Sequence, residues 1–209
     1  MTTNSSNPKR FAMGLAVAGA VMMAGCSTPV PTQFHSLLAP PSAQPEAPAS
    51  AGAATLIYDF GPVSIPPQVN QPQFVIRNPD DSLTLLEQQR WVAPLSDDIR
   101  GAMAERLGRR FGARIARDAL PGQKAVLRLN VDVLRFEAMP GREIRVEAAW
   151  SVRTLNDSAI GLRCHSDIRQ SVSNGYEAMT AGYRSALALL SDDIGPVLQA
   201  MANGPTTCR

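Results

Sequence analysis

Cys26 stands in the motif of this sequence that most clearly indicates a covalent modification. A basic pair, Lys9 and Arg10, precedes the apolar run 11–23, and two small residues come directly before the cysteine. The run is shorter than the roughly 20 residues a helix needs to cross a bilayer, and the arrangement is typical of a signal peptide. We therefore expect removal of residues 1–25 and acylation of the Cys26 thiol, as at a bacterial lipobox. The alternative is ordinary secretory cleavage, with Cys26 incidental.

The residue after the cysteine bears on the destination of such a lipoprotein. Position 27 is Ser, and under the usual Gram-negative sorting rule a residue other than Asp there directs the protein to the outer membrane. Stable anchoring needs two lipid signals, which the acyl chains on one cysteine would supply. We expect a lipid-anchored protein on the outer membrane, facing the periplasm, with residues 26–33 as its lipidated tether.

Loss of the signal peptide and acylation of Cys26 change both the net charge and the number of cysteines that can form disulfides. It removes Lys9 and Arg10, so 18 of the 20 basic residues remain beside 18 acidic ones, and the net charge falls from +2 to zero. A neutral chain gives no electrostatic reason to expect nucleic acid as a partner. Cys164 and Cys208 remain as an even pair in an oxidising compartment, which predicts a disulfide. Two unpaired thiols are the alternative, because sequence does not show how close the two residues come.

The search for a catalytic, metal or cofactor site is negative. The sequence has two histidines, His35 and His165, and lacks the GxSxG, HExxH, CxxC and phosphate-loop motifs. Cys164 and His165 are neighbours in an alternating segment, so their side chains should point to opposite faces and cannot form a nucleophile and base pair. We expect no enzyme activity and no cofactor.

Arginines concentrate in one stretch of the chain. Six lie within 18 residues, at positions Arg100, Arg106, Arg109, Arg110, Arg114 and Arg117. Arginine suits bidentate contacts to phosphate or carboxylate, so a lipid headgroup or an acidic partner could use them. A solvated helix face balanced by nearby acidic residues is the other interpretation. The candidate contact residues are Arg90, Trp91, Arg106, Arg109 and Arg110, although Trp91 could instead pack in the core or at the helix entry.

The N-terminal half combines a Pro/Ala-rich insertion with short apolar runs on both sides of it. Residues 39–54 are almost entirely Pro, Ala, Ser and Gly, which predicts a flexible loop or linker. Apolar runs indicate strands at 34–38, 55–60, 73–77 and 83–86. Gly61-Pro62 and Pro66-Pro67 should separate two of these strands, since proline cannot donate in a central ladder.

The C-terminal half shows clearer periodicity. Apolar residues at four-residue spacing predict a helix that opens at Pro94 and ends at Gly112. Alternation then predicts three antiparallel strands, at 127–133, 144–152 and 160–172, with turns at Pro140-Gly141 and Asn156-Asp157.

A second helix should run from 175 to 202, kinked or broken near Gly195-Pro196. The fold class is therefore α+β, a largely antiparallel sheet with a C-terminal meander and two amphipathic helices packed on one face. The domain should span 34–202, and residues 203–209 form a tail.

Several segments together resemble a known family. They are YDFGPVSIPP at 58–67, QPQFVIR at 71–77, RWVAPLSDDI at 90–99 and SALALLSDDI at 185–194, with Arg135-Phe136 ending one strand and Trp150 in the next. This combination is similar to the ABC-type transport auxiliary lipoproteins of the PqiC type, over nearly the whole mature chain.

The resemblance implies a role rather than a reaction. It implies an outer-membrane-anchored, non-catalytic component of a system that moves lipids between the two membranes. The implied partners are a periplasmic MCE-domain protein and its membrane-embedded partner, and a homo-oligomeric ring is a further expectation. A stand-alone structural or stress-related envelope lipoprotein is the first alternative, and a periplasmic lipid hydrolase the second.

Overall fold

The computed structural model describes residues 30–38, 56–118, 122, 124–155, 161–204 and 206–208. Its two compact units are Met1–Pro31 and Thr32–Arg209, and everything below concerns the second. The expected signal peptide, Cys26, the Pro/Ala-rich segment and the turn at 156–157 lie outside the described residues.

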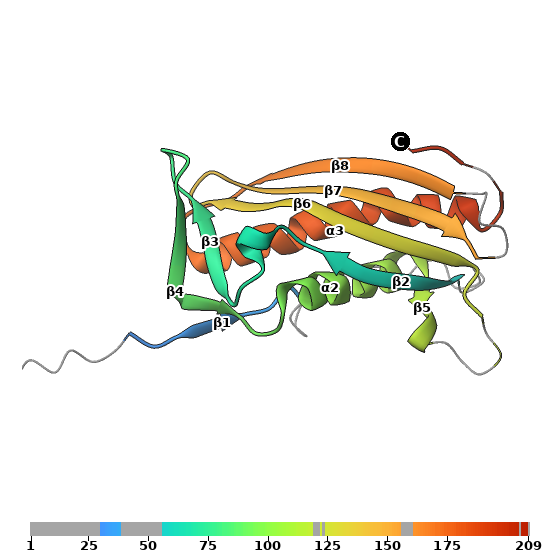
Figure 1. The fold of residues 1–209 in the computed structure, drawn as a ribbon, viewed down its shortest axis with the longest axis horizontal. Helices are drawn as coiled ribbons and strands as arrows, with labels where there is room; N and C mark the ends of the chain where they lie inside the picture. The colour runs from blue at the N-terminus through green and yellow to red at the C-terminus, as the bar shows by residue number, and fades with distance from the viewer. Residues whose placement is uncertain are drawn as a thin grey trace, which may run out of the picture. The chain divides into compact units, whose positions relative to one another are not determined.

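The larger sheet has five strands in the order β5-β2-β6-β7-β8 (Figure 1). Its strands are β2 (Leu56–Ser64), β5 (Ala113–Ile115), β6 (Leu127–Met139), β7 (Glu143–Thr154) and β8 (Gly161–Ser171). The last three form the expected antiparallel meander. Strand β2 is parallel to both of its neighbours, β5 and β6, so the sheet is mixed.

A smaller sheet has the order β1-β4-β3, with β1 (Gln33–His35), β3 (Gln73–Arg77) and β4 (Leu83–Trp91). Strand β4 is antiparallel to β3 and parallel to β1. It is longer than the expected strand at 83–86, and it delivers Trp91 to the start of the first helix. A short 3-10 helix, η2 (Pro67–Val69), separates β2 from β3, as the Pro66-Pro67 pair predicted.

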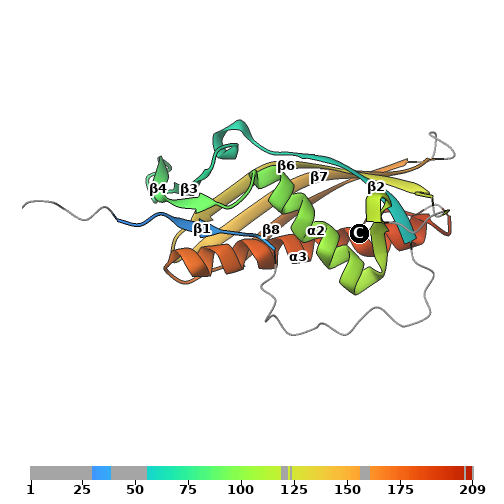
Figure 2. The ribbon, with the colours of Figure 1, turned by 90° about the horizontal axis from the view of Figure 1, so that it is seen from below.

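Two long helices cover one face of the five-stranded sheet (Figure 2). Helix α2 (Leu95–Phe111) follows Pro94 and ends at Gly112, whose left-handed φ of 65° suits glycine. Helix α3 (Tyr176–Met201) packs on β7 and β8 and against α2. No helix in the described ranges is long and apolar enough to cross a membrane.

Helix α3 continues through Pro196, so of the predicted kink or break at this point the break is wrong. Proline removes only one backbone hydrogen bond from a helix, and the buried neighbours Ile194, Val197 and Leu198 hold the segment on both sides of it.

The prediction that the strand at 55–60 ends at Gly61-Pro62 is also wrong. Strand β2 runs through both residues, and its register with β6 shifts between Phe60 and Val63. Such a bulge takes the proline out of the ladder, so its missing N–H costs no sheet hydrogen bond. The Nε of Arg100 on α2 donates to the carbonyls of Phe60 and Gly61, at 3.1 Å each.

Candidate functional site

Trp91 lies in an aromatic cluster inside the domain. Its side chain is 6% exposed, and its ring centroid is 4.0 Å from that of Phe74 and 5.9 Å from that of Tyr183. Tyr183 in turn stacks on Phe136 at 4.0 Å, and its complete burial raises the pKa of its hydroxyl far above the usual value. The structure therefore supports the core alternative for Trp91. Arg90 points elsewhere and donates to the carbonyl of Glu87.

An open groove of about 380 Å³ lies beside this cluster. It is lined by Asn70, Gln71, Pro72, Trp91, Val92, Ala93, Pro94 and Leu95. Val92 is 60% exposed at its rim. The lining carries no ionisable side chain, so the groove offers shape and apolar contact rather than chemistry.

The candidate arginines of α2 are engaged with carboxylates. Arg106 binds Asp192 of α3 in a bidentate manner, with Nε and Nη2 donating at 3.1 and 2.7 Å. The Nε of Arg110 lies 3.4 Å from the same carboxylate, and Arg109 pairs with Glu105 at 2.8 Å on its own helix. The contacts of Arg106 and Arg110 with Asp192 join α2 to α3, whereas the Arg109–Glu105 pair lies within α2.

A second groove, of about 210 Å³, runs between the two helices. Leu37, Ala102 and Leu187 are among its apolar lining residues, and Arg106, Arg109 and Arg184 are among its charged ones. The structure therefore brings Arg106 and Arg109 to one groove, whereas Arg90 and Trp91 lie in another part of the domain.

The segment after β1 is bound to both helices through groups that sequence reasoning missed. Asp98 of α2 is buried and accepts hydrogen bonds from the Leu37 backbone N–H at 2.7 Å and the Ser36 hydroxyl at 3.1 Å. Arg184 of α3 donates from Nε and Nη2 to the Ser36 carbonyl, at 3.1 and 2.6 Å. An acidic residue in a first helical turn is ordinarily explained by the helix dipole, so its sequence context gave no sign of this contact.

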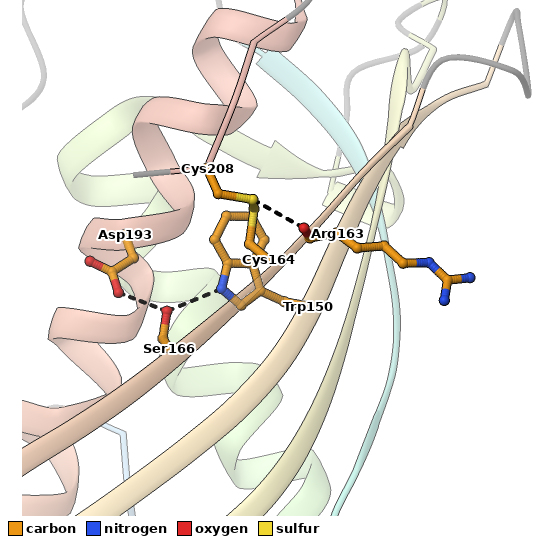
Figure 3. Close-up of a disulfide and its surroundings, with 6 residues drawn as sticks. All are labelled: Trp150, Arg163, Cys164, Ser166, Asp193 and Cys208. Carbon is orange, nitrogen blue, oxygen red and sulfur yellow. Dashed lines mark hydrogen bonds between the residues drawn. A yellow bond between two sulfur atoms is a disulfide. The ribbon is translucent and has the colours of Figure 1, made fainter.

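The predicted disulfide between Cys164 and Cys208 is present, with an S–S distance of 1.99 Å and a Cα–Cα distance of 5.7 Å (Figure 3). It joins the C-terminal tail to β8. Close by, the Trp150 indole N–H donates to the Ser166 hydroxyl at 3.1 Å, which donates to Asp193 of α3 at 2.8 Å. The bond and the chain of hydrogen bonds hold the tail, the sheet and α3 together.

The described residues contain no arrangement that suggests catalysis or metal binding. Cys164 is committed to the disulfide, while His165 points to the opposite face and lies 3.1 Å from Glu147. Within the described ranges, no group of three His, Cys, Asp or Glu side chains could hold a metal ion.

Comparison with solved structures shows the fold. A crystal structure of an uncharacterized protein matches with a TM-score of 0.63 and 15% identity, covering 81% of this chain and 99% of the other. A protein from Xanthomonas campestris matches with a TM-score of 0.57 and 15% identity, covering 74% and 92%. The PelC dodecamer of Paraburkholderia phytofirmans, at a TM-score of 0.39 and 12% identity over 72% and 94%, is too distant to inform assembly. No curated protein matches the chain significantly.

The sequence comparison is more specific. Residues 36–195 match the model of the ABC-type transport auxiliary lipoprotein component family. The matched range begins at Ser36, which binds both helices, and extends almost to the end of α3. It therefore includes the five-stranded sheet and strands β3 and β4 of the smaller sheet. The chain therefore belongs to this family, as a lipid-anchored auxiliary component of an ABC-type transport system.

Proposed function

We propose that this protein is a non-catalytic adaptor in an MCE-type lipid transport system, anchored to the outer membrane and facing the periplasm. The family match over residues 36–195 carries the proposal. The finer assignment to an MCE system is supported by the segments at 58–67 and 90–99, which form β2 with its bulge and the β4–α2 connection. A stand-alone envelope lipoprotein or a lipid hydrolase is less well supported, because neither draws on the family's place in a transport system.

The interior of the described domain favours a protein that acts through contacts on its surface over one that encloses a lipid molecule. The space between the five-stranded sheet and the helices is filled by a continuous apolar core. The grooves beside Trp91 and between the two helices are open and of about 380 and 210 Å³, at or below the lower end of ordinary ligand pockets. A lipid with two acyl chains would find no enclosed volume of its size there.

The anchor is proposed at Cys26, after cleavage of residues 1–25. Residues 26–33 are then a short tether to the domain at 34–202, with 203–209 as the tail. From Cys26 to Thr32 the chain can span at most about 25 Å. Such a tether holds the β1 side of the domain close to the membrane.

The test is crosslinking of the tagged, acylated protein in cells, followed by purification in mild detergent and mass spectrometry of bound proteins and lipids. We expect an MCE-domain protein to be recovered with it. A Cys26→Ser variant is the matched control, since it should lose acylation and outer-membrane fractionation and leave the domain folded.

Two results would count against the proposal. Recovery of the acylated protein with neither partner nor lipid would favour an independent envelope role. Outer-membrane fractionation of an acylated Cys26→Ser protein would refute the anchor.

A further inference from the structure

One face of the five-stranded sheet is left uncovered by the helices, and its charges are unevenly distributed. Toward the β6–β7 turn, acidic and basic side chains alternate across the strands. Arg145 binds Asp167 at 2.8 Å, Arg135 binds Glu147 at 2.8 Å, and Arg169 lies 3.7 Å from Glu143. This end of the face is electrostatically balanced by itself.

The opposite end carries arginines from four strands. We name these four residues the arginine band: Arg114 of β5, Arg128 of β6, Arg153 of β7 and Arg163 of β8. The register places them on one face, because Arg128 pairs with Arg153, Arg163 pairs with Ser151, and Arg114 lies beside Ile57, two residues from the partner of Arg128. Arg114, Arg153 and Arg163 are exposed.

Among the described residues, little negative charge offsets the arginine band. Arg128 pairs with Asp59 at 3.2 Å, and no ion pair joins Arg114, Arg153 or Arg163 to any carboxylate of the described residues. Arg128 and Arg153 are also direct cross-strand neighbours. Like charges in that position destabilise a sheet, and Asp59 offsets only the charge of Arg128. An anion bound from outside would offset that of Arg153.

Two exposed apolar side chains lie beside the arginine band. Val126 and Leu155 are each 40% exposed, and the Leu155 N–H donates to the Val126 carbonyl at 3.0 Å. Val126 precedes Arg128 by two residues and Leu155 follows Arg153 by two. The hydrogen bond between them extends the pairing of β6 with β7, which places both on the face of the arginine band. Arginine beside exposed apolar surface is a composition typical of protein interfaces and unlike that of a merely solvated surface.

We propose that the arginine band, with Val126 and Leu155, is a docking surface for an acidic segment of a protein partner that also carries apolar side chains. This inference rests on the proposed anchoring at Cys26, which favours a protein over a lipid headgroup. Figure 1 shows β1 at one end of the domain and β5 at the other. Strand β6 spans 13 residues, or about 40 Å, so the arginine band lies well beyond the short tether.

The test uses the mature, acylated protein in neutral detergent micelles and a fluorescein-labelled peptide of alternating Glu and Leu, with binding followed by fluorescence anisotropy. The variant R153Q/R163Q removes two charges from the arginine band. The matched control R142Q/R169Q removes two exposed arginines near the β6–β7 turn, so the net charge of the two variants is equal. A third variant, V126S/L155S, tests the apolar pair.

We expect R153Q/R163Q to weaken peptide binding by about tenfold and to reduce its salt dependence, since exposed charges are screened by salt. The control should stay within about twofold, and V126S/L155S should weaken the Glu-Leu peptide more than a Glu-Ser peptide. Equal losses in the two double-arginine variants, or no loss in R153Q/R163Q, would overturn the proposal.

Short-chain phosphatidylglycerol serves as competitor. If it displaces the peptide at concentrations below those at which the peptide binds, the occupant is a lipid headgroup and the assignment to a protein is wrong. Peptide binding requires neither an MCE-domain protein nor lipid transport. The docking proposal can therefore fail while the proposed function stands, and the proposed function can fail while the arginine band still binds the peptide.

Discussion

Asp98 illustrates how a single buried carboxylate can fix a chain segment. Its two oxygens accept hydrogen bonds from the backbone and the hydroxyl of consecutive residues, Leu37 and Ser36, directly after the strand through which the chain enters the domain. Leu37 itself is 1% exposed. The carboxylate therefore holds the apolar Leu37 side chain in place, and tension on the proposed lipid tether would act on this contact.

The Asp98→Ala variant should be clearly less stable than the wild type. Hydrogen bonds to a charged group contribute about 1.5 to 3 kcal/mol each, and the Leu37 N–H would be left buried without a partner. We expect a loss of about 2 to 3 kcal/mol in urea unfolding monitored by tryptophan fluorescence. Asp97→Ala is the control, because Asp97 is exposed in the same helical turn. Equal stabilities of the two variants would contradict the role of Asp98.

Tyr58 presents the opposite case, a buried polar group with no partner. Its side chain is 0% exposed, its hydroxyl has no hydrogen-bond partner among the described residues, and burial raises its pKa well above the usual value. Removal of an unsatisfied hydroxyl avoids its desolvation cost. Tyr58→Phe should therefore raise the free energy of unfolding by about 1 kcal/mol, whereas Tyr176→Phe, at an exposed site, should change it little. A destabilised Tyr58→Phe variant would show that the hydroxyl is satisfied in solution.

The contact between α3 and the sheet depends on a glycine. A Cβ at Gly182 would overlap Val172 and lie 2.8 Å from the Ile144 side chain. The same addition at Gly108 of α2 would meet its nearest atom at 3.5 Å, an ordinary contact. The two positions therefore separate packing from helix propensity.

Gly182→Ala should destabilise the protein by about 1 to 3 kcal/mol, because overpacking outweighs the gain in propensity. Gly108→Ala should be neutral or stabilising by up to about 1 kcal/mol. Thermal unfolding of the two variants in parallel measures both. A Gly182→Ala protein as stable as Gly108→Ala would mean that α3 can shift on the sheet at no cost.

The disulfide links the tail that follows α3 to strand β8. It closes a loop with a sequence separation of 44, and a crosslink of that length stabilises a domain by about 2 to 4 kcal/mol, mainly by restricting the unfolded chain. Cys208→Ser should lose about that amount, and Thr207→Ala in the same tail should not. Identical urea unfolding of the wild type with and without reductant, or two free thiols by alkylation and intact mass, would contradict this.

For the molecule as a whole, sequence periodicity predicted the elements better than their pairing. Strands β6 and β7 alternate buried and exposed side chains, so their sequences carried the signal. The parallel placement of β2 beside β6 joins residues about 70 positions apart, and no local pattern encodes it. The second half of β4 was missed because Glu87-Gln88-Gln89-Arg90 is polar, although the backbone there is extended.

The predicted site residues show the same difference between what local sequence indicates and what depends on distant neighbours. The disulfide followed from compartment and cysteine count, whereas the burial of Trp91 could not be decided without its neighbours. The arginines on α2 were correctly noted as a cluster, but their main partner, Asp192, lies on another helix. The arginine band was missed because its members are far apart in sequence and meet only through sheet register.

The charged face of the sheet should make the stability of the whole domain depend on acid pH. The His165 imidazole and the Arg135 and Arg145 guanidiniums surround Glu147 and lower its pKa. The hydrogen bonds from Arg145 lower the pKa of Asp167. Because both values lie below those of the unfolded chain, these carboxylates stabilise the fold fully above about pH 5, and the contribution is lost as the pH falls through the lowered values.

Urea unfolding at pH 7 and at about pH 2.5, below the unfolded-state pKa of both carboxylates, tests this directly. The wild type should lose stability on acidification, and Asp167→Asn should lose less, because its side chain has no proton to gain in this range. Asp81→Asn is the control: Asp81 is an exposed carboxylate at a φ of 65°, a conformation that asparagine also adopts readily. Its pH dependence should follow that of the wild type. If Asp167→Asn instead keeps the full pH dependence, the acid sensitivity arises elsewhere and the ion pairs of this face are only surface contacts of little energetic weight.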